Sequence, residues 1–397
     1  MPAPLAAALV GLLSAHAAQG AIIYWDGTGT AWNAVGSWSS VAGAATPDPA
    51  AVPGVNDTAT FSISTLTNTA QTVNLNAAQS VLGLSFLGTN TATTLLQGGG
   101  VANQTLTLGT SGISVASLAG AVTIGSTSAL QNVAIILGGA QSWTNNSANA
   151  LTVVNGVTDG GFLLTLAGTG AINLNGVLSG SGGLTNGGSG VTTLSGANTY
   201  TGLTTISAGT LAYGVTNALS SGGVTVNGGT LDMKTFSDTV GTVTLSAGSI
   251  TGSTGVLTGT SYVLNNATGT TTASAILGGA VTLAKSGVGT AILSGANTYT
   301  GATTVTAGVL NIQNATALGT VAGGVTVSAN AALQIQGGIS VGAEALSLNG
   351  TGIATDGALR NISGTNTYGG LVTLGSATRI NSDAGTLTLS IHLLCSC

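Results

Sequence analysis

Apolar and polar residues alternate in short runs along most of the chain, which is the pattern of β-strands with one buried face. In the stretch TTVTAGVLNIQ, which begins at residue 303, Val305 lies between two threonines, and a glycine separates this run from a second apolar pair. The stretch GGVTVNGGTLDM, from residue 222, has the same arrangement. The residues predicted to be buried are Val226, Leu231, Val305 and Leu310, and those predicted to be exposed are Thr225 and Thr304.

These short strands recur at a nearly constant interval. Ile206, Val226 and Leu245 are 20 and 19 residues apart. Such an interval is typical of one coil in a parallel β-solenoid, whose successive coils stack about 4.8 Å apart. We therefore predict an all-β fold, a parallel β-helix with coils of about 20 residues. A transmembrane barrel would need two aromatic girdles, which four Trp, six Tyr and four Phe cannot supply. An antiparallel sandwich would show linkers, and we find none between residues 70 and 390.

A nine-residue sequence, LSGANTYTG, occurs at 194–202 and again, unchanged, at 293–301, and a related copy, ISGTNTYGG, begins at residue 362. The 99 residues between the first two copies predict about five coils, and the 69 residues to the third require coils of unequal length. We interpret the asparagines as turn residues and expect the tyrosines to stack along one edge of the solenoid. The repeat-defining residues are Asn198, Tyr200, Gly202, Asn297, Tyr299, Gly301, Asn366 and Tyr368.

The longer stretches LSGANTYTGLTTISAGTL (194–211) and LSGANTYTGATTVTAGVL (293–310) resemble the autotransporter-associated β-strand repeat of bacterial passenger regions. The resemblance covers roughly residues 120–390. It extends to a lysine before the Gly-rich turn, which is Lys285 in one copy and is replaced by Asn186 in the other. The resemblance implies a right-handed parallel β-helix that is exported. Classical members are exported by an outer-membrane translocator, which we do not identify in this sequence.

Charged residues are scarce. They make up 3% of the chain, against roughly 25% in ordinary globular proteins, and the net charge is −5. The basic residues, Lys234, Lys285, Arg360 and Arg379, are too few and too scattered to neutralise a phosphate backbone, so we predict no nucleic-acid partner. With so few titratable groups, we also expect the free energy of unfolding to change little between about pH 5 and pH 9.

The composition restricts the chemistry that the chain can perform. The two histidines are His16 and His392, and the two cysteines are Cys395 and Cys397, so residues 21–390 have neither type for a catalytic or metal site. We predict no cofactor and no metal. Because β-helices can host polysaccharide lyases and glycosidases, the carboxylates remain as an alternative acid/base site. The residues of that alternative are Asp232, Asp238 and Asp356; the competing interpretation places them in solvated turns with a weak local ion pair.

Aromatic and threonine residues offer two further sites. Trp25, Trp32 and Trp38, with Tyr24, could stack on sugars, but we favour a cap that covers the first coil. An ice-binding face would need threonines on successive coils. The T-x-T triplets, such as 105–107 and 386–388, are not regularly spaced, which argues against one.

We divide the chain into four parts: a signal peptide (1–20), an N-terminal capping segment (21–60), a β-solenoid repeat domain (61–390) and an anomalous tail (391–397). The apolar run from Leu5 to about Ala15, followed by small residues, is typical of a secretory signal. The tail, IHLLCSC, contains no Gly, Asn or Thr, unlike the rest of the chain. We therefore expect the chain to be a fragment, or altered at its end, and an open last coil to favour end-to-end self-association.

The sequence therefore predicts an exported, adhesin-like passenger module on the bacterial surface or outside the cell, without catalysis. The expected ligand is a surface glycan or a molecule on a host or neighbouring cell. The alternative is a carbohydrate-active β-helix enzyme.

Overall fold

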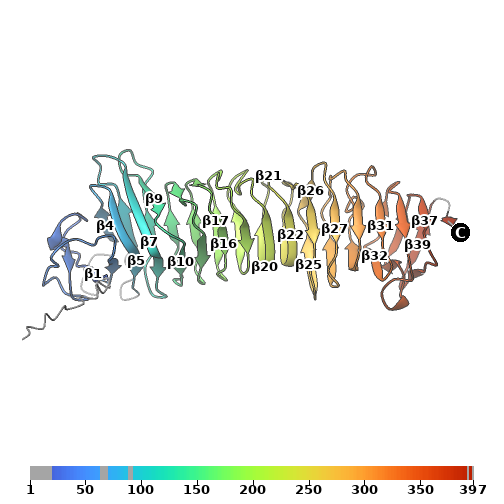
Figure 1. Cartoon of the computed structure of the whole chain (residues 1–397), viewed down its shortest axis with the longest axis horizontal. Coiled ribbons are helices and arrows are strands. Elements are labelled where there is room, and N and C mark those ends of the chain that lie inside the picture. The colour runs from blue at the N-terminus through green and yellow to red at the C-terminus, as the bar shows by residue number, and fades with distance from the viewer. Residues whose placement is uncertain (1–19, 63–69, 88–92, 391–392, 396–397) are drawn as a thin grey trace, which may run out of the picture.

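Strands of successive coils pair in parallel along an elongated solenoid, as the computed structural model shows (Figure 1). The structure describes residues 20–62, 70–87, 93–390 and 393–395. The solenoid has about 15 turns of about 21 residues, and 45% of the chain is strand. The predicted all-β solenoid is therefore confirmed. The predicted signal peptide, except Gly20, lies outside the described residues, as do four residues of the tail.

Each coil contributes strands to up to three faces. The first face is an unbroken ladder in which each strand pairs in parallel with the strand one coil above. Its strands are β10 (Gln141–Asn145), β13 (Leu164–Ala167), β16 (Leu184–Asn186), β18 (Thr204–Ile206), β20 (Val224–Asp232), β22 (Val243–Thr251), β24 (Tyr262–Leu264), β27 (Leu283–Lys285), β29 (Thr303–Val305), β31 (Val325–Val327), β34 (Leu346–Leu348), β37 (Val372–Leu374) and β40 (Leu393–Cys395).

The second face runs beside the first, and the long strands β20 and β22 take part in both faces. Its other strands are β8 (Val122–Ile124), β11 (Leu151–Val153), β14 (Ile172–Leu174), β17 (Val191–Leu194), β19 (Thr210–Tyr213), β25 (Thr270–Ala273), β28 (Thr290–Leu293), β30 (Gly308–Ile312), β32 (Ala331–Gln336), β35 (Leu359–Ser363) and β38 (Ile380–Ser382).

The third face is interrupted. Its strands form three separate groups rather than one ladder. They are β9 (Val133–Leu137), β12 (Val157–Thr158) and β15 (Leu178–Ser179); β21 (Asp238–Thr239), β23 (Val256–Thr258) and β26 (Ile276–Gly278); and β33 (Ser340–Val341), β36 (Thr365–Tyr368) and β39 (Thr386–Leu389). The two gaps therefore need connections other than strand pairing.

The N-terminal strands join the same stack. Between β1 and β2 lies the 3-10 helix η1 (Val35–Ser37), and a second one, η2 (Ile353–Thr355), follows β34. Among the described strands, β1 and β2 form the one antiparallel pair, while β1 also pairs in parallel with β3. The strands are β1 (Ile22–Trp25), β2 (Trp38–Ser39), β3 (Thr58–Phe61), β4 (Ala70–Asn74), β5 (Gln79–Phe86), β6 (Thr93–Gln97) and β7 (Gln104–Val115).

The core is a set of columns, because inward residues of paired strands lie directly above one another. In the first face one column rises through Ile206, Val226 and Leu245, and the same column reaches Val305. From Asn186 to Lys285 it takes five coils, which confirms the interpretation of the 99-residue interval. The three coils above Val305 have 22, 21 and 26 residues, so the 69-residue interval does contain unequal coils.

The four predicted core residues, Val226, Leu231, Val305 and Leu310, are fully buried. Thr225 and Thr304 are half-buried instead of exposed. The difference arises because the side chain of Thr225 lies between Thr205 on the coil below and Thr244 on the coil above. An outward position inside a ladder is always covered on two sides by its neighbours.

We predict that Val226→Asp lowers the free energy of unfolding by about 3–5 kcal/mol, because it places an unpaired charge among apolar neighbours. Thr225→Asp should cost less than about 1 kcal/mol, since its side chain points outward. Urea denaturation of the two variants and the wild type measures both effects. Equal losses for the two variants would show that the inward and outward positions are assigned wrongly. Val226 is a better probe than Val305, because Val305 lies directly above Lys285.

Candidate functional site

The first copy of the nine-residue repeat lies in a gap of the third face. Residues 197–201 form no strand, although the coil below carries β15 at this place. The side chain of Asn198 fills the missing connection. Its Oδ1 accepts a hydrogen bond from the Leu178 N–H of the coil below, at 2.7 Å, and its Nδ2 donates to the Ala218 carbonyl of the coil above, at 2.5 Å. The amide thus replaces a pair of backbone ladder bonds.

The second copy makes the same connection in the other gap. Asn297 Oδ1 accepts from the Leu277 N–H at 2.9 Å, and Asn297 Nδ2 donates to the Ala317 carbonyl at 2.7 Å. Both asparagines are buried, and neither lies in the left-handed region of backbone conformation. The interpretation of these asparagines as turn residues is therefore wrong: they connect three consecutive coils through their side chains.

The third copy differs because strand β36 persists there. Asn366 is buried and accepts a hydrogen bond from the Ile339 N–H of the coil below at 2.6 Å. Its Nδ2 stays within its own coil and donates to the Ser363 carbonyl at 2.8 Å. Backbone pairing of β36 with β39 already joins this coil to the next, so the upward amide bond is not needed.

The repeat tyrosines point into the core. Tyr200, Tyr299 and Tyr368 are fully buried, so they are not available to a ligand. The hydroxyl of Tyr200 lies 2.5 Å from Thr204 Oγ1, and that of Tyr299 lies 2.7 Å from Thr303 Oγ1. They do not stack on one another: the aromatic contact of Tyr299 is with Tyr262, at 6.0 Å between ring centroids. Burial raises the pKa of all three hydroxyls above the ordinary range.

The repeat glycines allow the coils to approach. A Cβ atom at Gly202 would lie 2.2 Å from the Gly182 carbonyl oxygen, and one at Gly301 would lie 2.4 Å from that of Val281. Real Cβ atoms are never this close to an oxygen, so a side chain at either position would push the coils apart. The glycines are thus required by the spacing of the ladder.

Asp238 is the buried member of the alternative acid/base set. Its Oδ2 accepts from the Leu219 N–H at 2.8 Å and its Oδ1 from the Thr239 N–H at 2.7 Å. Burial raises the pKa of the carboxyl. An open depression of about 490 Å³ lies beside it, with Asn198 and Ser220 in its wall, and Asp238 is the single carboxylate among the described residues that line it. Asp238 thus continues the connection that Asn198 begins.

The other two carboxylates lie elsewhere. Asp232 accepts the Lys234 N–H at 3.0 Å at the end of β20. Asp356 is on the exposed loop after η2, where Arg360 pairs with it at 3.2 Å and with Asp383 at 2.6 Å. Such exposed pairs contribute little to stability. Within the described ranges no three His, Cys, Asp or Glu side chains gather where a metal ion could bind. The structure therefore does not bring Asp232, Asp238 and Asp356 into one site.

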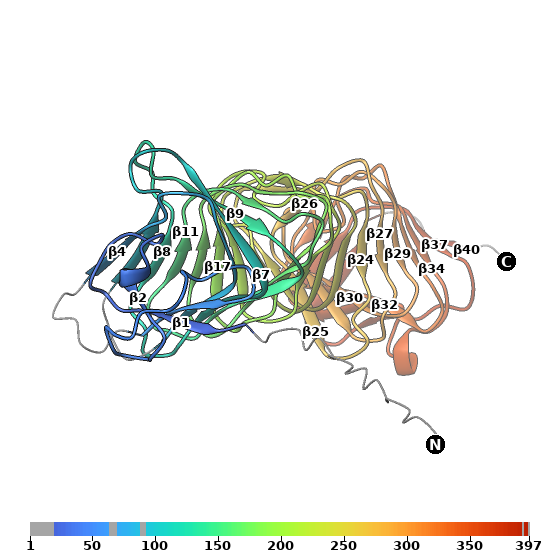
Figure 2. The ribbon, with the colours of Figure 1, turned by 60° about the vertical axis from the view of Figure 1, so that its left-hand side comes forward.

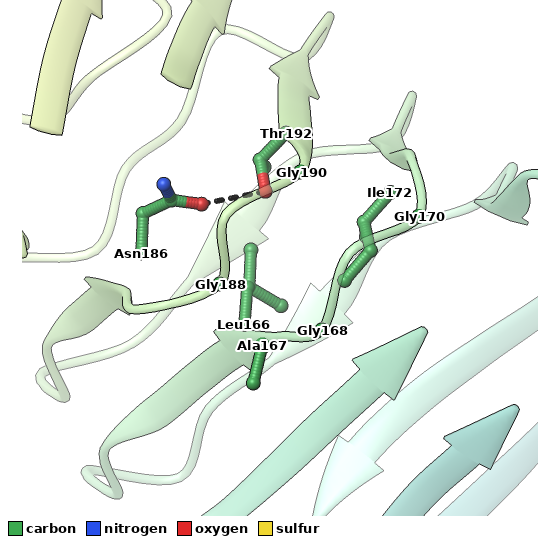
Figure 3. A pocket seen from close by; sticks show the side chains of 9 residues that line it. All are labelled: Leu166, Ala167, Gly168, Gly170, Ile172, Asn186, Gly188, Gly190 and Thr192. Carbon is green, nitrogen blue, oxygen red and sulfur yellow. Dashed lines mark hydrogen bonds between the residues drawn. The ribbon is translucent and has the colours of Figure 1, made fainter. Parts of the chain in front are cut away.

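Lys285 and Asn186 occupy equivalent positions in the core column of the first face, five coils apart. Lys285 Nζ donates to the Ala307 carbonyl at 3.3 Å and also to the Gly287 carbonyl. Asn186 Nδ2 donates to the equivalent carbonyl, that of Ala208, at 2.7 Å. Figure 3 shows Asn186 and its hydrogen bond from Thr192, which lies beyond the Gly-rich turn that contains Gly188 and Gly190. A lysine and an asparagine thus hold the same turn.

The side chain of Lys285 is fully buried in an apolar column, and its ammonium group contacts two backbone carbonyls. Leu264 lies below it in the column and Val305 above it. Desolvation lowers the pKa of Lys285 to about 8, from an ordinary value of 10.5. No salt bridge to Lys285 occurs in the part of the chain that the structure describes. The expectation of a nearly constant stability therefore needs revision above pH 8.

The tryptophans near the N-terminus form a cluster inside the first coils. Trp38 contacts Trp25 and Trp32 edge-on, with ring centroids 5.0 and 4.9 Å apart. All three rings are at most 2% exposed, so they cannot stack on a sugar. The cluster continues through Phe61, which stacks on Phe86 at 4.8 Å. These contacts agree with the interpretation of the tryptophans as a cap and exclude sugar stacking by the three tryptophans, while Tyr24 is half-buried.

Three segments of the chain, 184–212, 216–233 and 283–312, match the model of the passenger-associated-transport-repeat family. The first and third contain the two identical nine-residue copies and the strands on either side of them. No curated protein and no solved structure matches the chain. The chain therefore carries passenger-associated transport repeats, and these repeats together with the solenoid fit an autotransporter passenger, a class of exported protein. Among the described residues, no helix is long and apolar enough to cross a membrane.

We predict that Asn297→Ala lowers the free energy of unfolding by about 2–4 kcal/mol, because it leaves a buried N–H and a buried carbonyl without partners. The matched control is Asn227→Ala, which removes an exposed side chain and should change stability by less than about 0.5 kcal/mol. Urea denaturation followed by circular dichroism measures both. A loss for Asn297→Ala no larger than that of the control would contradict the bridging role.

We predict that the stability of the wild type rises with pH above 8. The folded state has the lower pKa at Lys285, so the unfolded chain binds more protons between about pH 8 and 10.5. The gain between pH 8 and pH 9.5 should be roughly 1.5 kcal/mol. Above pH 10 the buried tyrosines reverse the slope, because their hydroxyls ionise more easily in the unfolded chain. Denaturation of Lys285→Met at the same pH values is the control, and a gain in this variant too would rule out Lys285 as the cause.

Proposed function

We propose that the chain is an adhesin-like module that is displayed on the bacterial surface or released from it, and that it performs no catalysis. The observation that carries the proposal is the placement of the repeats. The matched segments lie in one continuous ladder, in which the first two are adjacent and the third follows after the coils of β22 and β24. The side chains that their repeats share are buried: Asn198 connects neighbouring coils, and Tyr299 fills the core. The repeat therefore builds a rod, and what the rod contacts must be found on its outer faces.

The scarcity of charge supports a rod that works outside the cell. Its stability comes from ladder hydrogen bonds and apolar columns, which respond less to salt than surface ion pairs do. An adhesin must present its faces at a distance from the cell, and a stack of about 15 coils gives such an extended shape (Figure 1). The ligand we favour is a glycan on another cell or surface.

The alternative, a carbohydrate-active enzyme, has no specific observation in its favour. Paired carboxylates in such enzymes lie within about 10 Å of each other on either side of the scissile bond. Here Asp356 is on the loop before β35, six coils above β20, and Asp238 is held by two backbone N–H groups. Neither arrangement positions a proton donor opposite a base.

We predict that antibodies against the chain label intact producing cells or the culture medium, and that the purified full chain adheres to glycan-coated surfaces without releasing sugar products. Reducing-sugar and unsaturated-product assays measure turnover, and Asp238→Ala and Asp356→Ala serve as controls. A chain confined to the cytosol would contradict export. Turnover that either substitution abolishes would contradict the absence of catalysis.

A further inference from the structure

A single column of threonines runs along the outside of the first face. Thr165, Thr185, Thr205, Thr225 and Thr244 lie on five consecutive coils, and each is paired in register with the next. The column is continued by Val263 and Ala284 and then by hydroxyl side chains again. We call this column the threonine track: Thr165, Thr185, Thr205, Thr225, Thr244, Val263, Ala284, Thr304, Thr326, Ser347 and Thr373. Figure 2 shows the strands β24, β27, β29 and β34, which carry part of it, side by side.

One flank of the track is apolar over the first four coils. The residues two positions before its first four threonines are Leu163, Gly183, Leu203 and Gly223. Each leucine leans over the glycine of the next coil. A Cβ atom at Gly183 would lie 3.4 Å from Leu163 Cδ1, and one at Gly223 would lie 3.3 Å from Leu203 Cδ1. The two leucines are 45% and 51% exposed, so over these four coils the flank offers methyl groups at every second coil. On the next three coils the same position carries Thr242, Ser261 and Thr282.

The other flank is polar. The residues two positions after the track are small and carry hydroxyl or amide groups on most coils, as in Ser207, Asn227 and Thr306, all of which are exposed. Ser246 Oγ donates to Asn265 Oδ1 of the next coil at 2.7 Å. Beside Thr205 and Thr225, a ligand on the track would thus meet the methyl groups of Leu203 on one side and hydrogen-bonding groups on the other.

Toward the C-terminal end the track becomes a groove. The leucines of the apolar flank are replaced there by Ala302, Gly324 and Ala345, and a cavity of about 210 Å³ opens beside Thr326 and Ser347. Neither the track nor its two flanks, from residue 163 to residue 375, contain a charged side chain. A ligand that lies here must therefore be uncharged, because an ion would lose its hydration without gaining a partner.

We propose that the threonine track binds an extended, unbranched and uncharged β-linked polysaccharide that lies parallel to the solenoid axis. The proposal rests on the adhesin-like function and names its ligand class. The track repeats once per coil, about every 4.8 Å. An extended β-linked chain advances by nearly the same distance per sugar, so consecutive sugars meet equivalent threonines. Alternate sugars of such a chain are turned over, which corresponds to the alternation of Leu163 and Leu203 with glycines over the first four coils.

The chemistry of each side chain fits a sugar. A threonine hydroxyl both donates and accepts hydrogen bonds, as sugar hydroxyls require, and its methyl group covers the apolar face of a ring. The track belongs to a continuous ladder, so binding orders no loop and loses little conformational entropy. An ice lattice repeats in two directions. Of the track and its two flanks, only the track is a row of threonines on consecutive coils. A linear polymer is therefore the better match.

The test compares two threonines of one coil. Thr185 is on the track in β16, and Thr193 is a half-buried outward threonine of β17 on the second face. The full chain and the variants T185K and T193K are incubated with insoluble cellulose and chitin, and with amylose as the α-linked control. Circular dichroism melts verify that both variants fold. We expect the wild type and T193K to be retained on a β-linked polymer, and T185K to bind about tenfold more weakly, since a long charged side chain blocks the column.

If T185K is retained as well as the wild type, or if T193K loses as much binding as T185K, the threonine track is not the binding site. Either result would leave adhesion by another face possible. Retention on amylose as strong as on the β-linked polymers would also overturn it. A chain that shapes growing ice through Thr185 but binds no polysaccharide would show that the column recognises ordered water, contrary to the proposal. A chain that adheres to no glycan-coated or cell surface at all would refute the proposed function itself.

Discussion

Every coil of this protein must form hydrogen bonds with the coil below and the coil above at one constant spacing. Parallel strands satisfy that requirement through the backbone, and the first face does so without interruption from β10 to β40. On the third face the chain leaves the strand conformation twice, and buried N–H and carbonyl groups would then lack partners, which is costly. The amide side chains of Asn198 and Asn297 supply the missing donor and acceptor. They do so because a primary amide has the same two functions as a peptide group.

This requirement explains why a sequence of nine residues is repeated so closely. The asparagine must reach both neighbouring coils, and the tyrosine must fill the core beneath a segment that forms no strand. The glycine is needed because a carbonyl oxygen of the coil below occupies the place that a Cβ atom would take. None of these tasks tolerates a substitute of another size. The equivalent core position held by Lys285 and Asn186 is more permissive, because either side chain can reach the carbonyl of the coil above.

The period of the apolar residues was sufficient to predict the fold, its coil length and the burial of Val226 and Leu310. Local patterns could not predict which side chains act between coils. Within a single chain segment an asparagine is most often a turn residue, whereas the partners of Asn198 and Asn297 are 20 residues away in both directions. The threonine track is not visible in a local pattern for the same reason. Its members are single threonines one coil apart and not T-x-T triplets within one strand.

The contrast between the faces determines where a ligand can bind. Coil length varies, and the longest coil of the upper part, 26 residues, contains η2 and its loop between β34 and β37. The extra residues are placed at the corners and on the third face, while the first face keeps its register from one coil to the next. Only a face of this kind can present the same side chain at equal intervals. The connections that Asn198 and Asn297 make on the irregular third face thus help to keep the first face regular, because they hold the coils at one spacing. This spacing is what the threonine track offers to a repeating ligand.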